Sequence, residues 1–172
     1  MTVQCGLQLS GVASLTAKCR KLVGHFRHSA QATAKLKHMQ KTLKMKEVKV
    51  KQEVASRWNS MYDMMERIIQ LKAPIATVLM EGKASAMSLV LSGEEFRELT
   101  AIMEVLKPLA EATTRLCKEK FSCLFVVEPL LSALLEKHLI VEDGTDDLSS
   151  VLRRTIANNL KERIRKQHCR LR

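Results

Sequence analysis

Apolar residues recur every three or four positions along most of the chain, which is the spacing that gathers them on one face of an α-helix. This periodicity predicts one helix over residues 7–26, another over 122–140, and four more that each follow a capping residue. Only three Pro and six Gly interrupt the pattern. The sequence therefore predicts an all-α helical bundle, with at most a short N-terminal strand remnant at Thr2–Cys5.

Small polar residues mark the expected helix starts, because their side chains can accept hydrogen bonds from the free N–H groups of a first turn. The third helix has two competing caps, Ser56 and Ser60. Pro74 lies inside that helix and is expected to produce a kink near Gln70–Ala73, since proline lacks a backbone donor. The other expected caps are Ser29, Ser92 and Thr145.

Two connecting segments lack helical spacing. Lys44–Lys51 is basic with a weak alternation of apolar residues, and either a loop or a short edge strand fits it. Gly82–Ser85 has the small residues that are typical of a loop. The first segment separates the second predicted helix from the third, and the other separates the third from the fourth.

Composition agrees with a helical protein that has a hydrophobic core, and it argues against a membrane-spanning, secreted or disulfide-linked protein. Aromatic residues make up 3% of the 172 residues, while apolar residues make up 46%, which is enough for a hydrophobic core. No apolar run is long enough to cross a membrane, and the N-terminus lacks the pattern of a secretory signal. Five irregularly spaced Cys argue against a disulfide framework and favour a reducing compartment.

Charge is distributed unevenly along the chain. Residues 18–51 carry eleven Lys and Arg against one Glu, residues 52–152 carry ten against sixteen acids, and residues 153–172 carry eight against one Glu. Both ends are therefore basic and the middle is acidic. A basic segment can bind a polyanion, or it can meet the acidic middle of another copy.

Sites for metals, cofactors and catalysis find no support in the residue spacing. No paired Cys and His clusters suit a zinc site, and no glycine-rich phosphate loop or nucleophile motif occurs. The acidic pairs Glu94/Glu95 and Asp146/Asp147 stand at predicted helix starts, where the helix dipole explains them. We therefore expect no catalytic residue, no metal site and no cofactor.

Two features are candidates for binding. The lysines of the segment 18–51 could neutralise phosphates, although the solvated face of amphipathic helices explains them equally well. The only Trp, Trp58, stands beside Arg57 at a helix start. There it could pack in the core, or it could stack on an unpaired base while Arg57 holds a phosphate.

Several stretches of the chain resemble the hAT-type DNA transposases, and most closely their vertebrate relatives, the zinc finger BED domain-containing proteins. The stretches Cys19–Ser29, Ala34–Lys37 and Ser56–Arg67 occur in that family's order and spacing. Leu91–Phe96 and Leu106–Thr113 are similar to the family's next helix. The resemblance covers residues 3–140, and the block around Arg57–Trp58 is its most specific part.

The resemblance implies a helical bundle like the insertion domain of an RNase H-like hAT transposase. It divides the chain into a basic helical segment at the end of the core (1–52), an insertion-domain-like region (53–140) and a basic C-terminal helix (141–172). The family's three catalytic acids would fall before Met1 and after Arg172. The chain is therefore expected not to be an enzyme.

The resulting expectation is a non-catalytic, transposase-derived nuclear protein that contributes DNA or protein binding, for example in transcriptional regulation. DNA binding would be electrostatic and of low specificity, with neither a membrane nor a small-molecule substrate as partner. The alternative is a protein-interaction or oligomerisation module without DNA affinity. The candidate DNA-binding residues are Arg57, Trp58, Lys35, Lys37, Lys41, Lys44, Lys46 and Lys49.

Overall fold

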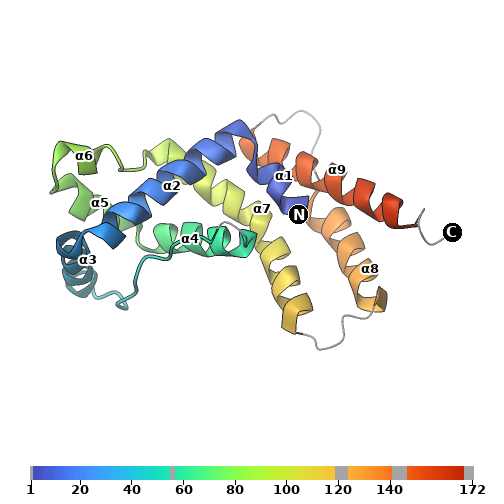
Figure 1. Cartoon of the computed structure of the whole chain (residues 1–172), viewed down its shortest axis with the longest axis horizontal. Helices are drawn as coiled ribbons and strands as arrows, with labels where there is room; N and C mark the ends of the chain where they lie inside the picture. Colours follow the sequence, from blue (N-terminus) through green and yellow to red (C-terminus); the bar gives the residue numbers. More distant parts are fainter. Residues whose placement is uncertain (1, 55–56, 119–123, 141–146, 169–172) are drawn as a thin grey trace. The chain divides into compact units, whose positions relative to one another are not determined.

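A computed structural model describes residues 2–54, 57–118, 124–140 and 147–168. Within these ranges the regular structure is helical and no β-strand forms (Figure 1). The all-α prediction is therefore confirmed. The N-terminal residues Thr2–Cys5, which could have been a strand remnant, lie instead in a short helix, α1 (Thr2–Leu7).

The chain forms two compact units, each with its own packing. One consists of Met1–Ala13 with Ala101–Arg172, and the other is the continuous segment Ser14–Thr100. The division at residues 52 and 140 that the family resemblance implies is a different partition, and it stays a prediction. All eight candidate DNA-binding residues belong to the continuous unit.

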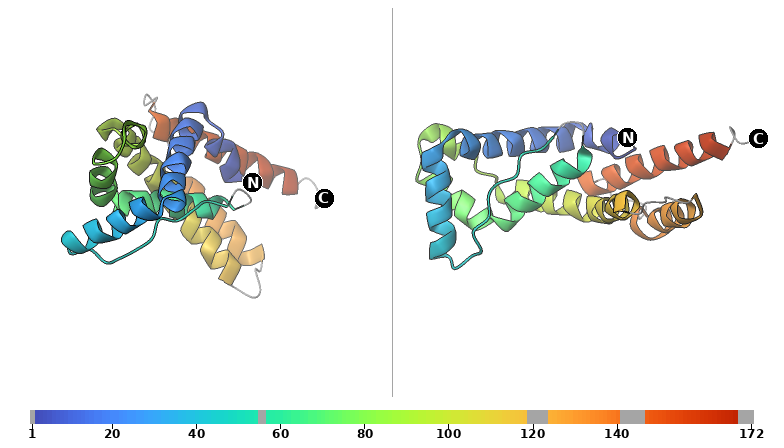
Figure 2. Two further views of the ribbon diagram at one scale, coloured as in Figure 1. Left: turned by 60° about the vertical axis from the view of Figure 1, so that its left-hand side comes forward. Right: turned by 60° about the horizontal axis from the view of Figure 1, so that its bottom comes forward.

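The continuous unit is built from most of α2 (Ser10–His28), from α3 (Ala30–Thr42), α4 (Trp58–Gln70), α5 (Lys72–Met80) and α6 (Ala84–Met87), and from the start of α7 (Gly93–Lys118). Figure 2 shows α3 turning sharply away from the end of α2. Helix α3 packs against α5, and α5 contacts α4 and α6. The core of the unit contains the fully buried side chains of Leu22, Phe26, Met64, Met65, Ile68, Leu71, Leu79 and Leu99.

Two predicted caps are present. The Ser29 side chain accepts a hydrogen bond from Ala32 N at 3.1 Å, at the start of α3. At the start of α7, Ser92 Oγ accepts from Glu95 N at 3.1 Å and Glu95 Oε2 accepts from Ser92 N at 2.7 Å. This reciprocal pair satisfies two backbone donors of the first turn. Glu95 also pairs with Lys18 Nζ at 2.7 Å, which ties α7 to α2.

The start of α4 differs from the prediction. The helix begins at Trp58 with Arg57 at the capping position and no side-chain cap, so Ser60 lies in the first turn and is not the cap. Ser56 lies outside the described residues. At the other end, the proline acts as predicted, because the helix is interrupted at Leu71 and a new helix, α5, places Pro74 in its first turn. A proline is tolerated there since first-turn N–H groups have no partner within the helix.

The two predicted connectors have different outcomes. Residues 45–53 have no regular structure, so Lys44–Lys51 is a loop and not an edge strand. The loop predicted at Gly82–Ser85 is shorter, because Ala84 and Ser85 begin α6. A side chain at Gly82 would place its Cβ 2.9 Å from Ala86 Cβ and 3.1 Å from Leu79 O, and this close approach explains why α6 can fold back so soon after α5.

The other unit contains α1, the remainder of α7, α8 (Leu124–Ala133), a π-helical turn η1 (Leu134–His138) and α9 (Leu148–His168). Helix α1 packs on α9, and the packing depends on Gly6, because a Cβ at that position would lie 2.6 Å from Leu152 Cδ1. The predicted helix over 122–140 is thus an α-helix that ends in a wider π turn. The expected cap Thr145 lies outside the described residues.

The capping box of α7 predicts a measurable loss of stability. Ser92→Ala removes the acceptor for Glu95 N and should lower the free energy of unfolding by about 1 kcal/mol. Chemical denaturation followed by circular dichroism measures the change. Ser14→Ala, at an exposed position of α2, is the control and should cause no loss.

The same box predicts a pH effect. Partial burial opposes ionisation of Glu95, but the hydrogen bonds from Lys18 and Ser92 outweigh it and hold the pKa of Glu95 below its ordinary value of 4.5. A carboxyl whose pKa is lowered in the folded state stabilises the fold above its unfolded-state pKa and loses that contribution as the pH falls through the folded-state pKa. Glu95→Gln should therefore be less stable than the parent at neutral pH and lose less stability below pH 4.5. An unchanged acid limb of the stability curve would contradict this.

Candidate nucleic-acid interface

A buried glutamine fixes the basic loop between α3 and α4. The Gln40 side chain is fully buried, and its amide pairs with the Val48 backbone, donating from Nε2 to Val48 O at 3.1 Å and accepting at Oε1 from Val48 N at 2.8 Å. The side chain thus replaces the neighbouring strand that an extended segment would otherwise need. The loop has no regular structure of its own, but it is anchored at its centre.

Four further contacts hold the loop on either side of Val48. Three are ion pairs: Lys37 with Glu47 at 3.0 Å, Lys51 with Asp63 at 3.0 Å, and Arg20 with Glu53, where two hydrogen bonds of 2.9 and 2.7 Å form a fork. The fourth is a hydrogen bond of 3.1 Å from Arg67 Nη1 to Lys49 O. The partners lie on α2, α3 and α4, so the loop is attached to three helices.

The loop starts with an unusual backbone conformation at Lys44. Its N–H bonds to Lys41 O at 3.0 Å, and Met45 N bonds to Gln40 O at 2.9 Å, which is the Schellman arrangement that ends many helices. This arrangement needs a left-handed residue, and Lys44 has a φ of 53°. Glycine is the usual residue there because a Cβ is disfavoured at such a φ. A lysine at this place puts a positive charge at the end of α3 at some cost in stability.

Most lysines of this region are free of acidic partners. Glu47 neutralises Lys37, and the hydrogen bond from that lysine lowers the pKa of Glu47. Among the described residues no carboxylate pairs with the exposed ammonium groups of Lys41, Lys44, Lys46 and Lys49. We call these four residues the loop lysines. They form a cationic surface on a segment whose backbone is held in place.

Arg57 and Trp58 stand where the loop joins α4. Val54 and Arg57 form an isolated antiparallel bridge, with Arg57 N donating to Val54 O at 2.8 Å. Ser60 Oγ accepts from Val54 N at 2.7 Å and lies 2.6 Å from Arg57 O, so it closes the turn. The Arg57 side chain is exposed and has no partner in the described part of the chain. Trp58 is half-buried.

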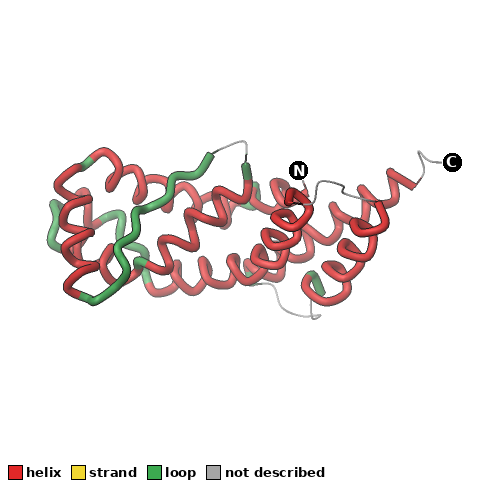
Figure 3. The backbone as a smooth tube through the Cα atoms, turned by 90° about the horizontal axis from the view of Figure 1, so that it is seen from below, coloured by secondary structure: helices red, strands yellow, loops and turns green. Residues whose placement is uncertain are grey.

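The loop runs back along α4 in the opposite direction, as Figure 3 shows. Lys49 lies beside Arg67, Lys51 beside Asp63, and Val54 beside Ser60. Nine residues separate Arg67 from Trp58, which corresponds to about 14 Å along the helix. The loop lysines and the Arg57–Trp58 pair therefore form the two ends of an extended strip and not a single point site.

Lys35 is separate from that strip. Lys35 and Lys37 lie on either side of the buried Leu36, about 200° apart around α3. Lys37 and Lys49 line a cleft of 260 Å³ between α2, α3 and the loop, whereas Lys35 lines a different pocket, against α5 and α6. Lys37, Lys41 and Lys49 lie close enough to Glu47 to lower its pKa, so the structure brings these three expected lysines together and leaves Lys35 apart from them.

Three residues that build the strip were not expected to hold the loop. Gln40, Ser60 and Arg67 bond to backbone atoms of the loop, and the sequence had marked only Ser60, as a candidate helix cap. A polar Gln on the apolar face of a predicted helix was the available signal, because a buried amide needs partners. Nothing in the sequence linked Ser60 or Arg67 to the loop, since a serine and an arginine are ordinary on a half-buried helix face.

The described residues hold no group of three His, Cys, Asp or Glu side chains placed to bind a metal ion. Three cysteines are free thiols, and burial raises the pKa of Cys19 to about 12, which makes it unreactive at neutral pH. No helix in the described ranges is long and apolar enough to span a membrane.

These features describe an all-helical unit that carries a fixed cationic loop. Residues 2–105 match the family described as the ZBED1 RNase-like helical domain, and the chain belongs to this family. The matched region contains every candidate DNA-binding residue. The resemblance to transposase-derived zinc finger BED domain-containing proteins is confirmed.

A curated relative supports the same family. The chain is 25% identical over 142 residues to the human zinc finger BED domain-containing protein 4. The aligned region is 83% of this chain but only 12% of that relative, so the chain corresponds to a small part of it. No solved structure matches the chain.

The Gln40 anchor can be tested directly. Gln40→Met keeps the approximate size of the side chain but removes both hydrogen bonds to Val48. The free energy of unfolding should fall by about 1–3 kcal/mol, because partly buried backbone groups lose their partners. Chemical denaturation measures it. Gln70→Met, at the exposed end of α4, is the matched control, and equal losses in the two variants would contradict the anchoring role.

Two substitutions at Lys44 separate the cost of its left-handed backbone from the effect of its charge. Lys44→Gly relieves the left-handed backbone and should raise the free energy of unfolding by about 1 kcal/mol, while Lys44→Ala should not. Thermal unfolding of the two variants separates backbone relief from loss of charge. A Gly variant no more stable than the Ala variant would show that the conformation carries no cost.

Proposed function

We propose that this protein is a non-catalytic, transposase-derived nuclear protein that binds the DNA backbone through the loop lysines, with Arg57 and Trp58 at the far end of the same strip. Binding is electrostatic and has little sequence preference, since phosphate contacts carry no base information. The family supports the nuclear location, and a role in transcriptional regulation would follow from binding DNA without cutting it.

The observation that carries the proposal is that the loop is fixed while its lysines remain unpaired. Five contacts hold residues 47–53, yet the ammonium groups of the loop lysines form no ion pair in the described residues. A polyanion that binds such a segment loses little affinity to ordering of the loop. A surface loop that was merely solvated would need no anchoring by a buried amide.

The length of the strip suits a polyanion. About 14 Å separate Lys49 from Trp58 along α4, which is about four base pairs of B-form DNA at 3.4 Å each. Arg57 would hold a phosphate, and the exposed part of the half-buried Trp58 would meet a base or a sugar. Asn59 lies next to them, and its Oδ1 is a buried acceptor without a donor among the described residues.

Four acidic residues of this unit have structural partners, which supports a binding role over a catalytic one for them. Glu47, Glu53, Asp63 and Glu95 each pair with a Lys or Arg of a neighbouring element. Carboxylates that hold a metal for phosphoryl transfer would have to converge on a shared point. Here each carboxylate closes a separate contact between elements.

The salt dependence of DNA binding tests the proposal. If the four loop lysines, Arg57 and one more cation contact phosphates, log K should fall against log salt with a slope of about −5. Fluorescence anisotropy with a labelled duplex, measured at several salt concentrations, gives this slope. Replacing Lys44, Lys46 and Lys49 together by Gln should make the slope shallower by about 3.

A matched variant controls for the overall change in charge. Lys107, Arg115 and Lys161 are also exposed, and replacing them by Gln removes the same charge from the other unit. This control should leave the slope almost unchanged. No duplex binding at low salt, or equal effects of the two triple variants, would refute the proposed interface.

The same experiments distinguish the alternative, a protein-interaction or oligomerisation module without DNA affinity. Leu43 and Val54 are large apolar residues at the two ends of the loop, and they are 45% and 50% exposed. If the loop binds protein, sedimentation should show association that high salt disrupts, and the loop triple variant should abolish it. DNA binding would then be absent.

A further inference from the structure

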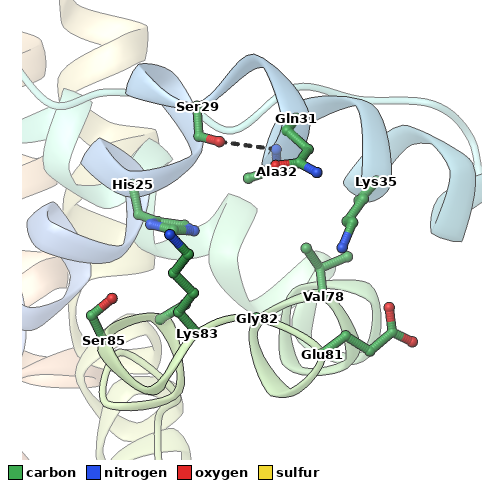
Figure 4. Close-up of a pocket in the computed structure, with 11 residues that line it drawn as sticks. His25, Ser29, Gln31, Ala32, Lys35, Val78, Glu81, Gly82, Lys83 and Ser85 are labelled. Carbon is green, nitrogen blue, oxygen red and sulfur yellow. Dashed lines mark hydrogen bonds between the residues drawn. The ribbon is translucent and has the colours of Figure 1, made fainter.

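A second cationic site lies on the other side of α3 from the loop. It is a pocket of 480 Å³ between the α2–α3 corner and the segment that joins α5 to α6. Figure 4 shows His25 and Lys83 reaching into the same part of this pocket from opposite walls, and Lys35 extending from α3 above Val78. The pocket lies entirely within the continuous unit.

Positive charge dominates the lining of the pocket. His25, Lys35 and Lys83 come from three different elements, and Glu81 is the one acidic residue among the lining side chains. None of the four forms an ion pair within the described ranges. The two ammonium groups in one pocket repel each other, and a bound anion would remove that repulsion.

The backbone adds to the positive character of the same wall. Ser29 and Gln31, which begin α3, line the pocket, and α3 is a 13-residue helix. The Ser29 side chain caps Ala32 N at 3.1 Å, and Ser29 O accepts from Thr33 N at 3.0 Å. The N–H of Gln31 has no acceptor in the described chain, so a first-turn donor is left free next to the pocket that Gln31 lines.

The opposite wall is held rigidly. Gly82 lets α6 fold closely against the end of α5, since a Cβ there would lie 2.9 Å from Ala86 Cβ. Lys83 follows directly and occupies the capping position of α6, with a φ of −68°. The position of its backbone is therefore fixed relative to Val78 and Ala86, which are both buried.

We propose that this pocket binds a phosphate group, held by Lys35, Lys83 and the His25 imidazole, with the first turn of α3 adding backbone N–H donors. Phosphate fits better than a carboxylate because it offers oxygens in several directions to donors on separate walls. The volume leaves room for more than the phosphate itself, so the group could belong to a nucleic acid or to a small phosphorylated compound. The proposal is independent of the loop, since Lys35 faces away from it.

Titration of the full chain with inorganic phosphate, followed by NMR chemical shifts of the His25 ring and of the Gln31 amide, tests the site. We expect saturable shifts with a dissociation constant of about 1 mM. Replacing Lys35 and Lys83 together by Gln should weaken binding at least about tenfold, because both ammonium charges of the pocket are lost. Circular dichroism shows whether the variant is folded, which is expected since both lysines are exposed.

The matched control is the pair Lys44→Gln and Lys46→Gln, which removes the same charge from the loop. It should bind inorganic phosphate as the parent does. Absence of saturation up to about 10 mM, or equal losses in the two double variants, would overturn the proposal. Neither result would alter the salt slope that tests the loop, so the two proposals fail separately.

A second arm of the experiment identifies the source of the phosphate. The pocket variant and the parent are compared for binding a short DNA duplex at one salt concentration. If the pocket variant loses more duplex affinity than the variant with Lys107, Arg115 and Lys161 replaced, the pocket binds a phosphate of the nucleic acid. Unchanged duplex affinity together with lost phosphate binding would assign the pocket to a small phosphorylated compound.

Discussion

The hydrogen bonds between Gln40 and Val48 are the interaction on which the candidate interface depends. An extended segment without regular structure leaves its backbone donors and acceptors to be satisfied elsewhere, and a buried amide supplies one of each. Because Gln40 is fully buried, leaving its amide unpaired would be costly, so the helix and the loop each require the other. The loop lysines then project from a fixed backbone.

Four of the acids in the continuous unit are used to join its elements. Glu47, Glu53, Asp63 and Glu95 each connect two elements through a Lys or Arg. The surplus of basic residues in segment 18–51 cannot be neutralised in this way and is left on the surface. It divides between the two sides of α3, with the loop lysines on one side and Lys35 on the other, where Lys83 from outside the segment and His25 line the same pocket. A surplus of charge in the sequence has thus become two separate surfaces.

Local signals predicted the helices well where each signal acted within one turn. Ser29 and Ser92 are caps because the bonds they form reach only three residues along the chain. Pro74 ended a helix for an equally local reason. Ser60, one of two candidate caps, is not a cap, because its hydroxyl bonds the turn at Val54 and Arg57. Capping rules do not recognise a contact that reaches six residues back. Short elements such as α6 were missed because tight packing at Gly82, and not periodicity, produces them.

The sequence by itself determined the helical class, the family, the basic segment and the Arg57–Trp58 pair, because periodicity, motifs and charge are properties of the order of residues. Only the tertiary structure decided which lysines act together. Lys35 and Lys37 are two positions apart in the sequence, yet helix geometry places them on opposite sides of α3. Lys49 and Arg57 share one strip because Arg67, Asp63 and Ser60 hold the loop against α4. Such contacts depend on how the chain folds back on itself, which residue spacing does not record.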